Sequence, residues 1–180
     1  ETALEVRNLT RYGSFENVSF TARHGEILGF TGLVGAGRTE VFRCVFGVDP
    51  LDAGEIFING KKIDIRDTRV AIAAGMAYVS EDRKGQGLVL EESVSRNLSL
   101  VNLKKFVKGF LINDKGVLKQ AKDTVDTLKI KTPSVESQVI NLSGGNQQKV
   151  VIGKWLNTDS AIYIFDEPTR GIDVGAKLEV

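Results

Sequence analysis

The chain has 180 residues, 42% of them hydrophobic and 26% charged, a balance that is typical of a folded globular domain and excludes a disordered or fibrous chain. Its 24 basic and 23 acidic side chains give a net charge of +1, so no general basic field favours nucleic acid as a partner. A single cysteine excludes an internal disulfide, no run of about 18 apolar residues predicts a membrane span, and the acidic start is unlike a signal peptide. We therefore expect a cytoplasmic location.

The first part of the chain predicts strands followed by a strand, a glycine loop and a helix. Alternating apolar and polar residues over 4–9 and 16–22 indicate an antiparallel sheet. A short apolar run at 26–31 leads through a glycine cluster into a helical pattern at 39–46. The segment 54–60 is a further strand ending in an Asn-Gly pair, a strong signal for a tight hairpin turn.

The rest of the chain alternates helices and apolar strands. The predicted elements are a helix at 69–74, a strand at 76–79, helices at 93–101, 115–128 and 147–156, a strand at 161–165 and a short helix at 174–180. Continuous apolar strands between helices indicate an α/β class with a parallel sheet covered on both faces. The middle third has the character of a helical insertion.

The segment 32–39, Gly-Leu-Val-Gly-Ala-Gly-Arg-Thr, follows a predicted strand and opens a predicted helix. In that context it fits the pattern Gly-x-x-x-x-Gly-Lys-Ser/Thr, in which curled backbone N–H groups and a helix N-terminus cradle a polyphosphate. The candidate phosphate-binding residues are Gly32, Gly35, Gly37, Arg38 and Thr39. The Thr39 hydroxyl is also a candidate Mg²⁺ ligand. Arg38 replaces the lysine of the pattern, and because its planar guanidinium does not match a compact point charge, we expect binding to survive better than turnover.

Two other interpretations of this loop stay open. It can be a glycine-rich turn that binds nothing, or the start of a dinucleotide-binding loop, Gly-x-Gly-x-x-Gly. The dinucleotide interpretation is disfavoured because Glu40 occupies the third glycine position, where close packing of helix on strand requires glycine.

Asp166 and Glu167 follow the apolar strand at 161–165, and ligands of open α/β sheets bind at the carboxyl ends of strands. Asp166 is a candidate Mg²⁺ ligand, and Glu167 is a candidate for orienting or deprotonating an attacking water. The alternative is a polar turn before Gly171. Together with the phosphate loop, the acidic pair favours a nucleotide hydrolase.

A second glycine-prepared helix start lies at 142–149, Leu-Ser-Gly-Gly-Asn-Gln-Gln-Lys. Ser143 can be a simple N-cap, but one nucleotide does not need two cradles, so this one is better explained as serving a nucleotide held by another domain. The segment resembles the signature motif of ATP-binding cassette (ABC) transporter ATPases. In that resemblance 32–39 corresponds to Walker A, 161–166 to Walker B, and Glu167 to the catalytic carboxylate.

The resemblance implies an α/β P-loop NTPase fold with an ABC-type antiparallel β subdomain, a parallel-sheet core and an inserted helical subdomain. It also implies a D-loop at 171–173 that includes Asp173. The residues of these motifs, together with Ser-Glu-Asp-Arg-Lys at 80–84, are most similar to those of the second nucleotide-binding domain of ribose/galactose/xylose-type sugar importers. The expected subdomains are 1–85 with 157–180, and 86–156.

The resemblance implies ATP and Mg²⁺ as cofactors and a second ABC cassette, fused or dimeric, as partner. Residues expected to contact the partner's ATP are Ser143, Gly144, Gly145 and Gln147. Further implied partners are transmembrane permease subunits and, indirectly, a periplasmic sugar-binding protein, with the chain peripheral on the cytoplasmic side of a bacterial inner membrane. Tyr12 can stack on adenine or serve in packing. Glu81 lies where the family's Q-loop usually has glutamine, and as an acid it can repel phosphate or bind a cation.

The family's switch histidine normally follows the strand after residue 180, so we expect a C-terminally incomplete domain that hydrolyses ATP poorly by itself. An alternative is a degenerate, non-hydrolysing module that only completes the partner cassette's active site. A soluble cassette protein of DNA repair or translation is disfavoured because the chain has no basic stripe.

Overall fold

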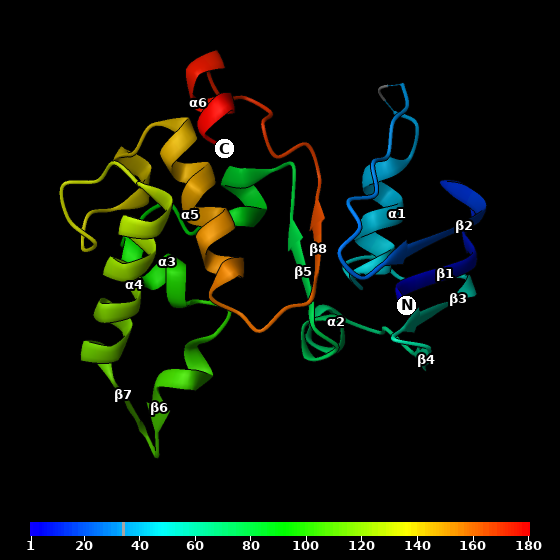
Figure 1. Cartoon of the computed structure of the whole chain (residues 1–180), viewed down its shortest axis with the longest axis horizontal. Helices are drawn as coiled ribbons and strands as arrows, with labels where there is room; N and C mark the ends of the chain where they lie inside the picture. The colour runs from blue at the N-terminus through cyan, green and yellow to red at the C-terminus, as the bar shows by residue number, and fades with distance from the viewer. Residues whose placement is uncertain (34) are drawn as a thin grey trace. The chain divides into compact units, whose positions relative to one another are not determined.

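The computed structural model describes residues 1–33 and 35–180 and divides the chain into two compact units (Figure 1). Unit 1 comprises residues 1–78 and 160–164, and unit 2 comprises residues 79–159 and 165–180. In the described parts of the chain, no helix combines the length and the apolar character needed to cross a membrane.

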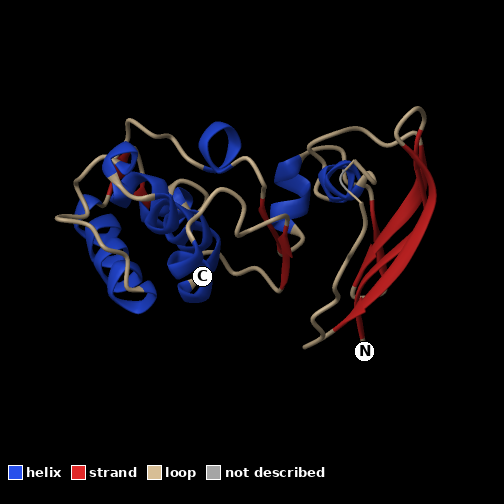
Figure 2. Cartoon of the chain, turned by 90° about the horizontal axis from the view of Figure 1, so that it is seen from above, coloured by secondary structure: helices blue, strands red, loops and turns tan. Residues whose placement is uncertain are grey.

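Unit 1 contains a four-stranded antiparallel sheet, drawn in red beside the N-terminus in Figure 2. The strand order is β2-β1-β3-β4. Its strands are β1 (Thr2–Arg11), β2 (Phe15–Arg23), β3 (Ala53–Ile58) and β4 (Lys61–Ile63). The strands predicted at 4–9, 16–22 and 54–60 are confirmed. Asn59 and Gly60 form the two-residue turn between β3 and β4, and both have positive φ, 51° and 75°, as a type I′ turn requires.

Two helices belong to unit 1. Helix α1 (Arg38–Val45) buries Val41, Phe42 and Val45, which recur at helical spacing in the predicted segment 39–46. Helix α2 (Thr68–Ala73) begins after Asp67, whose carboxylate accepts from the backbone N–H groups of residues 69 and 70 at 2.8 and 3.1 Å. Both predicted helices are confirmed.

The prediction of a strand at 26–31 is wrong. Residues 26–33 form no strand, and Ile27 is 99% exposed. The segment is instead held by Phe30, whose ring packs edge-on against Phe20 of β2 and Phe42 of α1, with centroids 4.9 Å apart in each pair. An apolar run becomes a strand only where a neighbour exchanges backbone hydrogen bonds with it, and in the described chain no strand pairs with this run.

The predicted strands at 76–79 and 161–165 form a parallel pair, β5 (Met76–Val79) and β8 (Ile162–Phe165). The Gly75 carbonyl accepts from the N–H of residue 162 at 3.1 Å, and the Val79 carbonyl accepts from the N–H of residue 166 at 2.9 Å, so the register advances along both strands. All four residues of β5 are buried, as expected for a strand covered on both faces.

Unit 2 is mainly helical. Its elements are a π-helical turn η1 (Arg83–Gly87), helix α3 (Val94–Ser99), a 3₁₀ turn η2 (Leu103–Phe106), a hairpin of β6 (Val107–Lys108) and β7 (Leu111–Ile112), helix α4 (Asp114–Leu128), a 3₁₀ turn η3 (Val139–Asn141), helix α5 (Gly144–Leu156) and helix α6 (Val174–Glu179). The three long predicted helices are confirmed, but α5 begins three residues earlier than the apolar pattern indicates. Helices α3, α4 and α5 approach closely at Gly153, where a Cβ would lie 2.8 Å from Thr124 and 2.9 Å from Leu98.

Candidate functional site

The glycine loop leads directly into α1. Gly35 and Gly37 both have φ of +81°, a backbone conformation that glycine adopts at little cost, and Gly37 is the residue that precedes α1. The N–H of Ala36 donates to the carbonyl of Leu33 at 3.1 Å, which curls the loop back on itself. Gly37, the N-cap residue, has no side chain with which to cap the first turn of α1, so N–H groups of that turn can serve an anion. Val34 lies outside the described residues.

Arg38 and Thr39 begin α1 and are half-buried, whereas Gly32 and Gly35 are exposed. This places a guanidinium and a hydroxyl at the positively polarised end of the helix. The first turn therefore offers backbone donors, one cation and one hydroxyl in the order that the sequence predicted.

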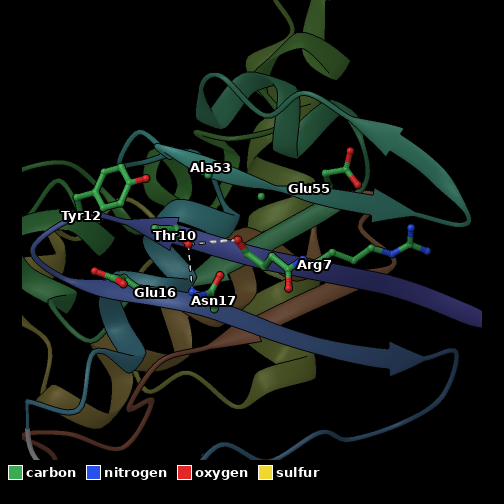
Figure 3. A pocket seen from close by; sticks show the side chains of 9 residues that line it. Arg7, Thr10, Tyr12, Glu16, Asn17, Ala53 and Glu55 are labelled. Atoms are coloured by element: carbon green, nitrogen blue, oxygen red, sulfur yellow. Dashed lines mark hydrogen bonds between the residues drawn. The ribbon is translucent and has the colours of Figure 1, made fainter.

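The turn between β1 and β2 lies beside the glycine loop. A Cβ on Gly37 would be 4.0 Å from the carbonyl oxygen of Ser14. Tyr12, in the same turn, is 71% exposed, and its backbone N–H donates to Asp52 at 2.7 Å. Its ring stands at one end of an open hollow of about 430 Å³ over the sheet, with Arg7 and Glu55 at the other end (Figure 3). An exposed aromatic ring thus belongs to the turn that approaches the glycine loop at Ser14.

A half-buried ion cluster fixes the other end of α1. Asp49 accepts from Arg43 of α1 at 2.8 and 3.0 Å and from Arg11 of β1 at 2.7 Å. The hydrogen bonds from Arg43 lower the pKa of Asp49, with Arg11 adding to the effect. This cluster ties the helix that starts at the glycine loop to the sheet that carries Tyr12.

In unit 2, Asp166 and Glu167 lie at the end of β8 in different environments. Asp166 is 5% exposed, whereas Glu167 is exposed and has φ of +45°, a left-handed conformation that costs a non-glycine residue about 1–2 kcal/mol. The N–H of Arg170 donates to the Glu167 carbonyl at 2.9 Å, which closes a turn around this strained residue. Strain of this kind is often retained at functional positions.

Among the described residues, no group of three or more His, Cys, Asp or Glu side chains could hold a metal ion by itself. Mg²⁺ does not require such a group, because it is commonly bound by one or two carboxylates together with phosphate oxygens and water. The Asp166 carboxylate and the Thr39 hydroxyl are donors of the right chemical type.

The predicted signature residues open α5. Ser143 precedes the helix, and its Oγ accepts from the Asn146 amide at 2.9 Å. A Cβ on Gly145 would lie 2.5 Å from the Cβ of Ala176, so the glycine allows α5 and α6 to touch. Gln147 is 4% exposed and donates to the carbonyl of Val139 at 3.1 Å, which makes it a packing contact of η3 rather than an open donor.

Two predicted residues have partners that the sequence did not indicate. Glu81 forms an ion pair with Arg170, so its charge is matched within the chain. Asp173 caps α6 by accepting from the N–H of Ala176 at 2.9 Å. The sequence indicated no role for Arg170 or for the buried Arg83, although Arg83 lies in the segment 80–84 that carries the resemblance.

The sequence matches the family described as ABC transporter over residues 15–170. The chain therefore belongs to the ABC transporter family. It is 52% identical over 180 residues to a ribose/galactose/methyl galactoside import ATP-binding protein of Rhizobium etli, covering 100% of this chain and 34% of that protein. It is 48% identical over 181 residues to a ribose import ATP-binding protein of Rubrobacter xylanophilus, covering 100% of this chain and 36% of that protein. The chain thus spans about a third of the length of these relatives.

Among solved structures, the fold is similar to that of an ATP-binding cassette in a dimeric, post-hydrolysis state bound to ADP and Pi, with a TM-score of 0.78 and 20% identity over 98% of this chain and 78% of that chain. The predicted fold class is confirmed: a mixed α/β fold of the ABC ATPase cassette type, with an antiparallel β subdomain and a parallel sheet.

Proposed function

We propose that the chain is the ATP-binding, ATP-hydrolysing domain of a sugar importer and couples MgATP binding and hydrolysis to monosaccharide uptake. The observation that carries this proposal is the glycine loop, whose left-handed Gly35 and Gly37 turn its backbone into the start of α1. The import function is supported by the names of the Rhizobium and Rubrobacter relatives, which are sugar import ATP-binding proteins.

In this proposal the nucleotide is held by groups of unit 1. The backbone of Gly32, Gly35 and Gly37 surrounds the phosphates, and Arg38 adds charge at the same helix end. Tyr12 offers its exposed ring to the adenine, a contact worth about 1–3 kcal/mol for a stacked base.

Hydrolysis is assigned to Glu167, which would orient or deprotonate the attacking water. Thr39 and Asp166 are each proposed as ligands of Mg²⁺, and the ion would supply positive charge against the phosphates. Because the Asp166 carboxylate is buried, it is kept in place for such a ligand, whereas the exposed Glu167 can reach water.

We further propose that Ser143, Gly144 and Gly145 serve a nucleotide bound by a second cassette, and that Asp173 belongs to a D-loop at 171–173. The dimeric state of the similar cassette structure supports such a partner. Gln147 would act indirectly, by fixing η3 against α5. Permease subunits and a periplasmic sugar-binding protein complete the proposed importer, with this domain the second of two cassettes on the cytoplasmic side of the inner membrane. The proposed subdomains remain 1–85 with 157–180, and 86–156.

A matched pair of glycines tests the nucleotide site. Gly35 and Gly60 have φ of +81° and +75°, and apart from its chain neighbours a Cβ at either would meet no described atom within 4 Å, so alanine imposes a similar strain at both. Titration of the 180-residue chain with MgATP should show an affinity about 10-fold lower in Gly35→Ala and unchanged in Gly60→Ala. Equal affinities in the two variants and the unsubstituted chain would place the nucleotide elsewhere.

The substitution of lysine by Arg38 favours a second candidate, a non-hydrolysing module that only completes the partner's site. In the full-length protein, Glu167→Gln should abolish most transport if this cassette hydrolyses ATP and leave transport nearly intact if it does not. Ser143→Arg should impair transport in both cases. Transport that tolerates both substitutions would contradict both functions.

A further inference from the structure

Arg83, in η1, is an unusual buried charge. Its side chain is 9% exposed, and within the described chain no carboxylate forms an ion pair with it. Its Nη1 donates to the carbonyl of Arg170 at 3.3 Å and its Nη2 to the carbonyl of Gly171 at 3.4 Å, while its buried Nε meets no acceptor in residues 1–33 and 35–180. Burying a guanidinium against neutral carbonyls is unfavourable, so the arrangement calls for a reason beyond stability.

The guanidinium lies where two other segments meet. A Cβ on Gly144, in the first turn of α5, would be 3.3 Å from Nη2 of Arg83 and 3.4 Å from the carbonyl oxygen of Gly171. Gly171 itself has φ of +68°, and a Cβ there would be 4.0 Å from the same nitrogen. Arg83 therefore fills the space between the start of α5 and the loop that leads to Asp173.

Residue 170 is held twice. The Glu81 carboxylate pairs with the Arg170 side chain, and Arg83 binds the Arg170 carbonyl. An exposed ion pair such as Glu81–Arg170 contributes little free energy, but together with the buried contact it fixes both the side chain and the backbone of one residue. Segment 81–83 thus contacts the Arg170 side chain through Glu81 and the 170–171 backbone through Arg83.

We propose that Arg83 is a positioning residue that, with the Glu81–Arg170 pair, holds the 170–171 backbone against the first turn of α5 and so sets the position of Asp173 relative to Ser143 and Gly144. This inference rests on the proposed function, because Ser143, Gly144 and Asp173 are the residues proposed to serve the second cassette. A movement of segment 81–83 would be carried to that surface through two carbonyl contacts and one ion pair.

Hydrogen exchange in the 180-residue chain tests the contact itself. In Arg83→Met the amides of 169–173 should exchange at least 10-fold faster, while those of α4 keep their rates. The exchange rates of 169–173 in Arg83→Lys should fall between those of the unsubstituted chain and Arg83→Met, because one ammonium does not reproduce the two hydrogen bonds of a guanidinium. The control Arg96→Met removes an exposed arginine of α3 that pairs with Glu92, and it should leave 169–173 unchanged.

Unchanged exchange at 169–173 in Arg83→Met, or equal acceleration in α4, would overturn the proposal. Should Arg83→Met not fold, Arg170→Ala removes the Glu81 pair but keeps the carbonyl, and it should accelerate only 169–173. Acceleration spread over the whole unit, or none, would refute the proposal.

Turnover in the full-length protein tests the consequence. Arg83→Met should lower kcat for ATP at least 10-fold and change KM less than twofold, because the groups proposed to hold the nucleotide of this chain belong to unit 1, whereas Arg83 belongs to unit 2. Arg83→Lys should recover part of kcat. A raised KM with unchanged kcat would contradict the positioning role. Absence of turnover in the unsubstituted protein would contradict the proposed hydrolysis, and the exchange experiment would still decide the role of Arg83.

Discussion

Lys154 of α5 gives a direct test of the energetics of unit 2. Its side chain is 5% exposed, its ammonium donates to the carbonyl of Gly87 at 2.6 Å and lies 5.5 Å from the centroid of the Trp155 ring. Desolvation by burial lowers the pKa of Lys154 to about 8. A lysine in this setting destabilises the folded state whenever it is charged.

The size and the sign of the effect follow from the two pKa values of Lys154, about 8 in the folded chain and 10.5 in the unfolded chain. Between these values the unfolded state binds more protons, so stability rises with pH through that window. Below pH 8 the lysine is charged in both states, and the difference of about 2.5 in pKa corresponds to a cost of about 3 kcal/mol. Lys154→Met removes this cost but loses a hydrogen bond worth about 1–1.5 kcal/mol. We expect the variant to be more stable at pH 7 by about 1–2 kcal/mol.

The assay is urea unfolding of the chain and of Lys154→Met at pH 7, 8, 9 and 10. Groups such as Cys44 titrate in both proteins, so the difference between the two curves reports Lys154. The advantage of the variant should shrink steadily above pH 8 and reverse near pH 10. Lys119→Met, at an exposed position of α4 paired with Asp123, serves as a control and should give a difference that is independent of pH. Parallel curves for the chain and Lys154→Met would refute the reasoning.

Substitutions at three further positions test other contributions to stability. Asp49→Asn should lower stability by about 1–3 kcal/mol at pH 7, because it breaks the charged hydrogen bonds from Arg43. These bonds lower the pKa of Asp49, so their contribution to stability is present above the unfolded-state pKa of about 4 and is lost as pH falls through the folded-state pKa. A stability difference between the chain and Asp49→Asn that stays constant in thermal unfolding from pH 7 to 3 would contradict this. Glu167→Gly should be about 1 kcal/mol more stable than Glu167→Ala, because only glycine adopts φ of +45° without strain, and equal melting temperatures would exclude that strain. Gly145→Ala should cost about 1–3 kcal/mol through its clash with Ala176, and Ala176→Gly in the same chain should restore most of the loss in urea unfolding; an unrestored double variant would point to another cause.

The parts of the fold that the sequence predicted well are those encoded by local patterns. Helix α4 follows from apolar spacing, and the β3–β4 hairpin follows from the Asn-Gly pair, whose two residues adopt the positive φ that the turn needs. The glycine loop was predicted for the same reason, since its glycines are required by backbone geometry within a few residues.

The failures depend on distant neighbours. The run at 26–31 has the composition of a strand but exchanges ladder hydrogen bonds with no described strand, and the packing of Phe30 replaces them. Helix α5 starts at Gly144 because its glycines fit against Arg83 and Ala176, a tertiary gain that outweighs the poor helix propensity of glycine. Neither contact can be read from residues close in sequence.

Glu81 illustrates why a departure from a family pattern is hard to interpret from sequence alone. As an acid in place of a neutral glutamine, it suggested repulsion of phosphate or attraction of a cation. The structure gives it a counter-charge, Arg170, 89 positions away, so the substitution adds a paired charge rather than a free one. An acid at 81 and a base at 170 then form one feature, and exchanging the two charges together should disturb the 170–171 backbone less than changing either one, because only single changes leave a charge without its partner.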